Sequence, residues 1–189
     1  VHEKDLFTIE RALSDYLPDR NVEGLLFSYK HFYGSYSYIG SSRRWYRREV
    51  RIVRTGIGVR SWGDAQGFRI AGRKMRVKPV DASIYHYGWV KSPIKQQDKQ
   101  KNFNRYWHDD DWMKQNIGDS LEYDYSKGGS LEPFKGTHPD MMKNRIANQN
   151  WHFSYDRAKT KLSLRERALD WIESATGLRL GEYRNYELL

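Results

Sequence analysis

The sequence predicts an α/β protein in which helices flank a mixed sheet and a helical extension follows at the C-terminal end. Apolar residues recur at helical spacing at the start of the chain. Short strand-like runs, separated by Gly and Pro, then fill residues 22–90, and helix-start signals replace them after Gly88. The chain therefore divides into a mixed part, residues 1–90, and a mainly helical part, residues 91–189, that packs on the first.

The first part begins with a predicted helix over residues 3–17, which Pro18 ends. Its apolar positions recur every three or four residues: Leu6, Ile9, Leu13 and Tyr16. A Tyr/Ser-rich stretch from Gly34 to about Ser42 is expected to be a loop. Strands are expected on either side of this loop, at residues 22–32, 49–54, 57–62, 74–80 and 82–87.

The second part shows helix starts and no strand pattern. Ser92-Pro93 predicts a helix that runs to Trp107, because Ser is a good N-cap and Pro suits the first helical position. Further helices are expected from Asp109, from Thr137 and from the capping box Ser163–Glu166, the last one ending at Gly177. That last helix carries one apolar stripe, formed by Leu164, Ala168, Ile172 and Ala175.

Composition excludes several classes of protein. The chain has 189 residues and no Cys, so disulfides, thiolate metal sites and Cys nucleophiles are ruled out. Aromatic residues make up 15%, which is too many for a disordered chain. No apolar run approaches the roughly 20 residues of a spanning helix, and the sequence contains no Gly-rich phosphate loop and no G-x-S-x-G or H-E-x-x-H motif.

Positive charge is concentrated in residues 41–80. This window holds twelve of the 33 Lys and Arg residues but only two acids, Glu49 and Asp64, whereas the rest of the chain carries 21 bases and 22 acids. Such a window suggests a polyanionic partner, namely a nucleic acid, an anionic membrane surface or the phosphates of a small substrate. The alternative is a solvated face of the sheet.

Three places carry residues with possible chemistry. His86 stands at the end of a strand pattern just before Gly88, where open sheets place ligands; the alternative, a half-buried structural His, is the commoner case for such a residue. Asp64 lies between Gly63 and Gly67 among arginines, as an ion-pair partner or as a general base. Asp109-Asp110-Asp111 contains a D-x-D pattern, but acids at a helix start are favoured without any metal.

Five segments in order carry a resemblance: Val1-His2-Glu3-Lys4-Asp5-Leu6, Val22-Glu-Gly-Leu-Leu-Phe27, Arg44-Trp-Tyr-Arg-Arg-Glu-Val-Arg-Ile-Val-Arg54, Trp62-Gly-Asp-Ala-Gln-Gly-Phe68 and Ile84-Tyr-His-Tyr-Gly-Trp89. They resemble the C-terminal half of bacterial family-2-type glycosyltransferases of the GT-A fold. The resemblance covers residues 1–90 well and the remainder loosely. It implies a partial GT-A-like mixed sheet and a nucleotide-binding half upstream of Val1, which this chain lacks.

The resemblance also assigns roles. Asp64 corresponds to the acceptor-side acid, where many members carry Glu, and would be the catalytic base. His86 corresponds to the His that often completes the metal site, and Mg²⁺ or Mn²⁺ is the expected cofactor. Arg51 and Arg54 would face the donor phosphates. Substrate-binding aromatic and amide side chains are expected at Trp45, Tyr46, Trp62 and Gln66, although the aromatic residues could equally belong to the core.

The implied function is transfer of a sugar, with inversion, from a nucleotide-sugar donor to an acceptor hydroxyl. Its partners would be that donor and a glycan or another hydroxyl acceptor, in the cytoplasm or at the inner face of the membrane. The alternative function is a basic nucleic-acid-binding module, in which a strand face with interleaved Tyr and Trp grips single strands by charge and stacking.

Overall fold

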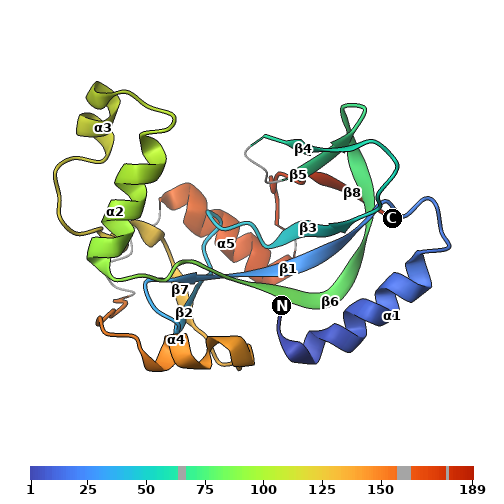
Figure 1. Cartoon of the computed structure of the whole chain (residues 1–189), viewed down its shortest axis with the longest axis horizontal. Helices are drawn as coiled ribbons and strands as arrows, with labels where there is room; N and C mark the ends of the chain where they lie inside the picture. The colour runs from blue at the N-terminus through green and yellow to red at the C-terminus, as the bar shows by residue number, and fades with distance from the viewer. Residues whose placement is uncertain (64–66, 157–162, 178) are drawn as a thin grey trace.

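The computed structural model describes residues 1–63, 67–156, 163–177 and 179–189, and within them eight strands form one sheet. The strands run in the order β4-β5-β6-β1-β2-β7, while β3 pairs with β1 and β8 pairs with β6 (Figure 1). Their bounds are β1 Gly24–Tyr33, β2 Tyr38–Gly40, β3 Arg48–Val53, β4 Val59–Trp62, β5 Gly67–Ile70, β6 Arg73–Trp89, β7 Leu131–Pro133 and β8 Tyr186–Leu188.

Parallel and antiparallel pairs occur together in this sheet. β6 runs parallel to both β1 and β8, and the remaining pairs are antiparallel. The flanking helices are α1 Leu6–Tyr16, α2 Pro93–Asn104, α3 Asp110–Asn116, α4 Lys143–Ala147 and α5 Leu164–Thr176. Short 3-10 helices cover Glu3–Asp5, Tyr125–Gly128 and Asp140–Met142. The predicted α/β class with a mixed sheet and flanking helices is therefore confirmed.

The two strands predicted at residues 74–80 and 82–87 form the single strand β6. The prediction separated them at Asp81, close to Pro79, which lacks a ladder donor. In the structure Pro79 lies opposite Leu26, directly before a register shift between Leu26 and Ser28. At this irregularity the ladder does not need the N–H group that Pro79 lacks. One 17-residue strand therefore continues through the proline.

Four short strands are absent from the sequence prediction. β2, β7 and β8 have three residues each and β5 has four. β7 and β8 belong to the part in which no strand was expected, and they pair with β2 and β6 of the first part. Segments this short contain no measurable alternation, so only their partners in space make them strands.

The core lies on both sides of β1, because Leu25 and Leu26 are adjacent on a strand and point in opposite directions. Leu25 packs with Ala12 of α1 in one buried cluster, which also contains Val22, Phe27, Val80 and Ala82. Leu26 belongs to a second cluster with Val50, Met75, Val77 and Tyr186. The buried Asp5 accepts a hydrogen bond from the Ser83 backbone N–H at 3.0 Å and thereby fixes the start of α1 against β6.

The second part of the chain attaches to the sheet through aromatic side chains and ion pairs. Tyr33 and Tyr125 are buried together with Leu131, and Trp45 and Trp89 pack around them. α5 begins with the predicted capping box between Ser163 and Glu166 and ends at Gly177, whose φ of 71° is left-handed. No helix in the described ranges combines the length and the apolar character needed to cross a membrane.

Candidate functional site

A cluster of polar and aromatic side chains forms where β1, β3 and β6 meet. Tyr29 and His31 are two residues apart on β1 and share a side of the strand, with ring centroids 4.6 Å apart. His86 of β6 lies opposite His31 in the ladder, and their rings are 5.4 Å apart at an angle of 82°. Tyr46 completes the group, with its ring 4.4 Å from His31. We call Tyr29, His31, Tyr46, Glu49, Arg51 and His86 the β1–β3–β6 cluster.

Glu49 and Arg51 supply the charges of this cluster. The Glu49 carboxylate is buried and accepts a hydrogen bond from Arg51 Nη2 at 2.5 Å, while the same nitrogen contacts the Tyr29 hydroxyl at 2.9 Å. Arg51 is the extra residue at a β-bulge, because Val50 pairs with Leu26 and Ile52 pairs with Leu25. Burial raises the pKa of Glu49 even though Arg51 and the two tyrosine hydroxyls counteract it.

His31 is a buried, neutral histidine with one free nitrogen. Its Nε2 lies 3.0 Å from the Tyr46 carbonyl oxygen, so Nε2 carries the proton and donates it. Nδ1 is buried and has no hydrogen-bond partner among the residues that the structure describes. Burial, reinforced by His86, lowers the pKa of His31 to about 4.

We expect an NMR titration to give His31 a midpoint near pH 4, because protonation places a charge in a desolvated site. The unfolded chain takes up this proton first, near the ordinary pKa of about 6.5. The His31 contribution to stability is therefore complete above about pH 6.5 and is lost as the pH falls towards 4. His31→Gln identifies the resonance, and a midpoint above pH 6 would contradict the burial argument.

His86 combines burial with an unused nitrogen. Burial lowers its pKa, and the charges of Lys99 and Arg51 add to the effect, so the ring is neutral near pH 7. Its Nδ1 has no hydrogen-bond partner in the described part of the chain. A Cβ at Gly88 would lie 2.5 Å from His86 Nε2. The glycine therefore makes room for the His86 ring, rather than for a ligand as its position in the sequence suggested.

The two predicted aromatic residues of this region differ in exposure. Trp45 is half-buried, and its indole N–H donates to the Gly128 carbonyl at 3.1 Å, so it is mainly a packing residue behind His31. Tyr46 is 36% exposed and lines a pocket of about 80 Å³ together with Glu49 and Gly67. Of the two, Tyr46 is the side chain that presents a free surface to a ligand.

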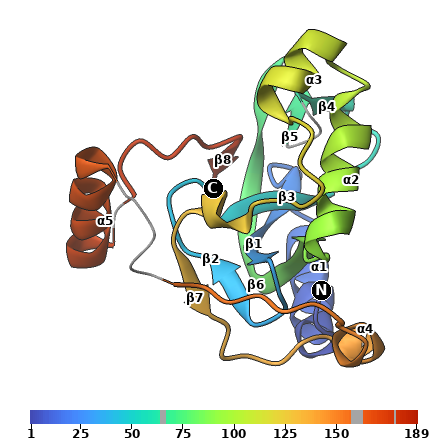
Figure 2. The same ribbon diagram turned by 90° about the vertical axis from the view of Figure 1, so that its left-hand side faces the viewer.

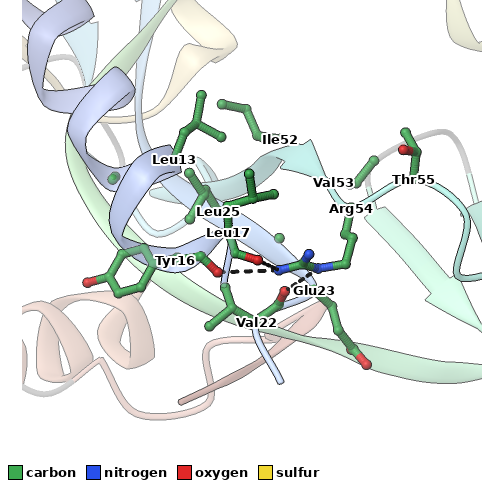
Figure 3. Close-up of a pocket in the computed structure, with 12 residues that line it drawn as sticks. Leu13, Tyr16, Leu17, Val22, Glu23, Leu25, Ile52, Val53, Arg54 and Thr55 are labelled. Carbon is green, nitrogen blue, oxygen red and sulfur yellow. Dashed lines mark hydrogen bonds between the residues drawn. The ribbon is translucent and has the colours of Figure 1, made fainter. Parts of the chain in front are cut away.

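Arg54 does not join the cluster. Its guanidinium donates to the carbonyl oxygens of Val22, Tyr16 and Leu17 at 3.0–3.3 Å (Figure 3). It also donates to the Asp19 carbonyl oxygen at 3.0 Å, and so it satisfies the C-terminal end of α1. These bonds cross the edge of a separate pocket of about 280 Å³ that has mainly apolar walls between α1, β1 and β3. Arg54 therefore stabilises the end of α1 and, unlike Arg51, does not belong to the cluster that contains His86.

Trp62 also lies apart from the cluster, at the end of β4. It is 51% exposed, and the guanidinium carbon of Arg69 lies 5.1 Å from its ring centre. Asp64 and Gln66 lie outside the described residues, and their expected roles as catalytic base and substrate-binding amide remain predictions. Gly67, which follows them in sequence, lines the same pocket as Tyr46 and Glu49.

Half of the twelve bases in the charge window form ion pairs among the residues that the structure describes. These bases are Arg43, Arg44, Arg47, Arg51, Arg73 and Arg76. Apart from Glu49, their acidic partners come from outside the window: Glu23, Glu166, Glu173 and Glu182. The free basic face available to a nucleic acid is therefore smaller than the charge count suggested.

The predicted metal site has few protein ligands. His86 provides one unused nitrogen, but no group of three metal-ligating side chains occurs within the described ranges. The D-x-D pattern of Asp109–Asp111 serves as a helix start, because the Trp112 N–H donates to Asp109 Oδ1 at 2.9 Å. These residues do not form a metal cage by themselves, and the divalent cation stays a prediction.

Tyr29, His31 and Glu49 were not selected from the sequence. Two signals pointed to them: Tyr29 and His31 alternate on one strand, and Glu49 is one of only two acids in the basic window. Neither signal shows that β3 and β6 bring Arg51 and His86 to the same place. Comparison of the chain with protein-family models, with curated proteins and with solved structures finds no match.

Proposed function

We propose that the chain is part of a glycosyltransferase with a GT-A-like sheet. The whole enzyme transfers a sugar, with inversion, from a nucleotide-sugar donor to an acceptor hydroxyl. One observation carries the proposal. Tyr46 and Arg51 from one segment of the family resemblance and His86 from another lie within one cluster. Their chemistry suits the task, since a ring can stack on a sugar and a guanidinium can bind phosphate.

In this proposal Arg51 binds the donor phosphates. Its side chain is 37% exposed, so N–H groups that do not contact Glu49 or Tyr29 remain open to a ligand. The neutral His86 offers a lone pair, which can accept a hydrogen bond or ligate a divalent cation. Such a cation, when bound, would supply positive charge to the leaving diphosphate. Asp64 takes the proton of the acceptor hydroxyl.

Donor binding by the full-length protein tests the role of Arg51. Arg51→Gln is expected to raise the Kd of the preferred donor about tenfold, the effect of losing a hydrogen bond to a charged group. The matched control is Arg60→Gln, because Arg60 is exposed on β4 and lies outside the cluster. Calorimetric titration with UDP-glucose and GDP-mannose measures the Kd, and thermal melting shows that both variants fold.

Two results would contradict the proposal. One is an equal Kd for the Arg51 and Arg60 variants, which would remove the phosphate role. The other is the absence of binding to every nucleotide sugar together with tight, steeply salt-dependent binding of single-stranded oligonucleotides, which would support the nucleic-acid module instead.

A further inference from the structure

Helix α5 is attached to the rest of the protein by its charged side. The Glu173 carboxylate forms ion pairs with Arg43 at 2.8 Å and with Arg47 at 2.9 Å. The Glu166 carboxylate forms one with Arg44 at 3.7 Å. At 100° per residue, Glu166 and Glu173 lie within about 20° of each other around the helix axis. The side of α5 that faces the protein is therefore acidic, and arginines of the β2–β3 connection neutralise it.

The apolar stripe of α5 points the other way. Leu164 and Trp171 are 83% and 71% exposed, and Ala168 and Ala175 are exposed between and beyond them. These residues lie on the side of the axis opposite Glu166 and Glu173. Figure 2 shows α5 at one extreme of the molecule, with open space beyond its outer side. The apolar stripe therefore faces solvent, except for the half-buried Ile172.

This arrangement is the reverse of an ordinary surface helix, which buries its apolar stripe and exposes its charges. Two of the three acids of α5, Glu166 and Glu173, are turned inwards and paired with arginines, and the third, Asp170, is half-buried. Arg165 and Arg167 remain exposed, one on each flank of the apolar stripe. An apolar stripe that contains Trp and is bordered by Arg is the pattern of helices that lie in the headgroup region of a bilayer.

We infer that α5 is a docking element for an anionic phospholipid surface, with Leu164 and Trp171 inserted at the headgroup level and Arg165 and Arg167 on the lipid phosphates. The charge on the outer side selects this occupant over an apolar protein groove. The inference is independent of the proposed transferase activity, because no residue of the β1–β3–β6 cluster takes part in it.

Vesicle co-sedimentation with the full chain tests this inference, using phosphatidylcholine vesicles with and without one quarter phosphatidylglycerol. We expect binding to the anionic vesicles that weakens as salt rises from 0.1 to 0.5 M. Trp171→Ser is expected to lower the partition coefficient about tenfold through lost apolar burial. Trp107→Ser is the matched control, since Trp107 is 70% exposed at the end of α2, and should leave binding unchanged.

The double variant Arg165→Gln/Arg167→Gln tests the charge. It should lose about tenfold or more of its affinity for anionic vesicles and most of the salt dependence. Equal losses for the Trp171 and Trp107 variants would overturn the inference, as would wild-type protein that binds neither vesicle. Light scattering that shows a dimer dissociated by Trp171→Ser, without vesicle binding, would assign the stripe to a second copy of the chain instead.

Discussion

Replacing Glu23 by Gln is expected to lower the free energy of unfolding by about 3 kcal/mol at pH 7. Glu23 is 4% exposed. Its carboxylate accepts hydrogen bonds from the Arg73 guanidinium at 2.5 and 2.9 Å. It also accepts hydrogen bonds from the Arg76 backbone N–H at 2.8 Å and from the Arg76 guanidinium at 3.2 Å. These bonds lower the pKa of Glu23 to about 2, the hydrogen bond from Arg73 contributing most. The variant leaves two arginines without their shared carboxylate.

The effect of Glu23→Gln on the free energy of unfolding should depend on pH. Because the folded pKa of Glu23 is lowered, its contribution is complete above about pH 4.5 and disappears as the pH falls through about 2. The difference in stability between wild type and Glu23→Gln should therefore shrink steadily from pH 5 to pH 2. The titration of His31 occurs in both proteins and cancels in this difference.

Urea unfolding at several pH values measures the effect. Glu10→Gln is the matched control, since Glu10 is exposed on α1, and it should change stability by less than about 0.5 kcal/mol. A difference below 1 kcal/mol for Glu23→Gln at pH 7 would argue against the carboxylate as a major link between β1 and β6. A difference that persists unchanged at pH 2 would refute the electrostatic cause.

Asp64→Asn is expected to reduce the turnover of sugar transfer by roughly 10²-fold or more, the usual size of a lost general base. Asn keeps the size and polarity of the side chain but cannot accept the acceptor proton at neutral pH. The donor Kd should stay nearly unchanged, because the phosphate contacts are assigned to other residues. Turnover and donor binding in the full-length protein measure the two effects separately.

Two comparisons sharpen this test. Asp81→Asn changes an exposed acid of β6 outside the cluster and should retain full turnover. Glu49→Gln changes the second acid of the basic window, which lines the pocket beside Gly67 and has a raised pKa. If Glu49→Gln abolishes turnover in a folded protein while Asp64→Asn keeps it within threefold, Glu49 replaces Asp64 as the base and Asp64 becomes an ion-pair partner.

Elements with local signals were predictable. α2 begins at Ser92-Pro93, α5 runs from the capping box at Ser163 to Gly177, and α1 ends just before Leu17-Pro18, as local signals predicted, although α2 ends at Asn104 and not at Trp107. The strands β1 and β3 were predicted from apolar and alternating runs. By contrast, β7 and β8 acquire strand geometry only through hydrogen bonds to β2 and β6. A segment of three residues contains no sequence pattern that predicts which strand it will pair with.

The candidate site divides in the same way. The family resemblance, carried by the order of short segments in the chain, selected Tyr46, Arg51 and His86. The sequence also placed Arg54 beside Arg51, three positions along one strand. In the fold, the bulge aims Arg51 at Glu49 and Tyr29, whereas Arg54 caps the end of α1. Neighbours in sequence thus serve different parts of the molecule.

By itself the sequence determined the α/β class, the starts of α2 and α5 and the basic window, since each depends on residues close together in the chain. Only the tertiary structure decided which of the basic residues form ion pairs and with which acids. It brought Glu23, Glu166, Glu173 and Glu182 to the arginines and turned the apolar stripe of α5 outwards. The reason is physical: an ion pair or a buried carboxylate depends on distances of a few ångströms between segments that lie far apart in the chain.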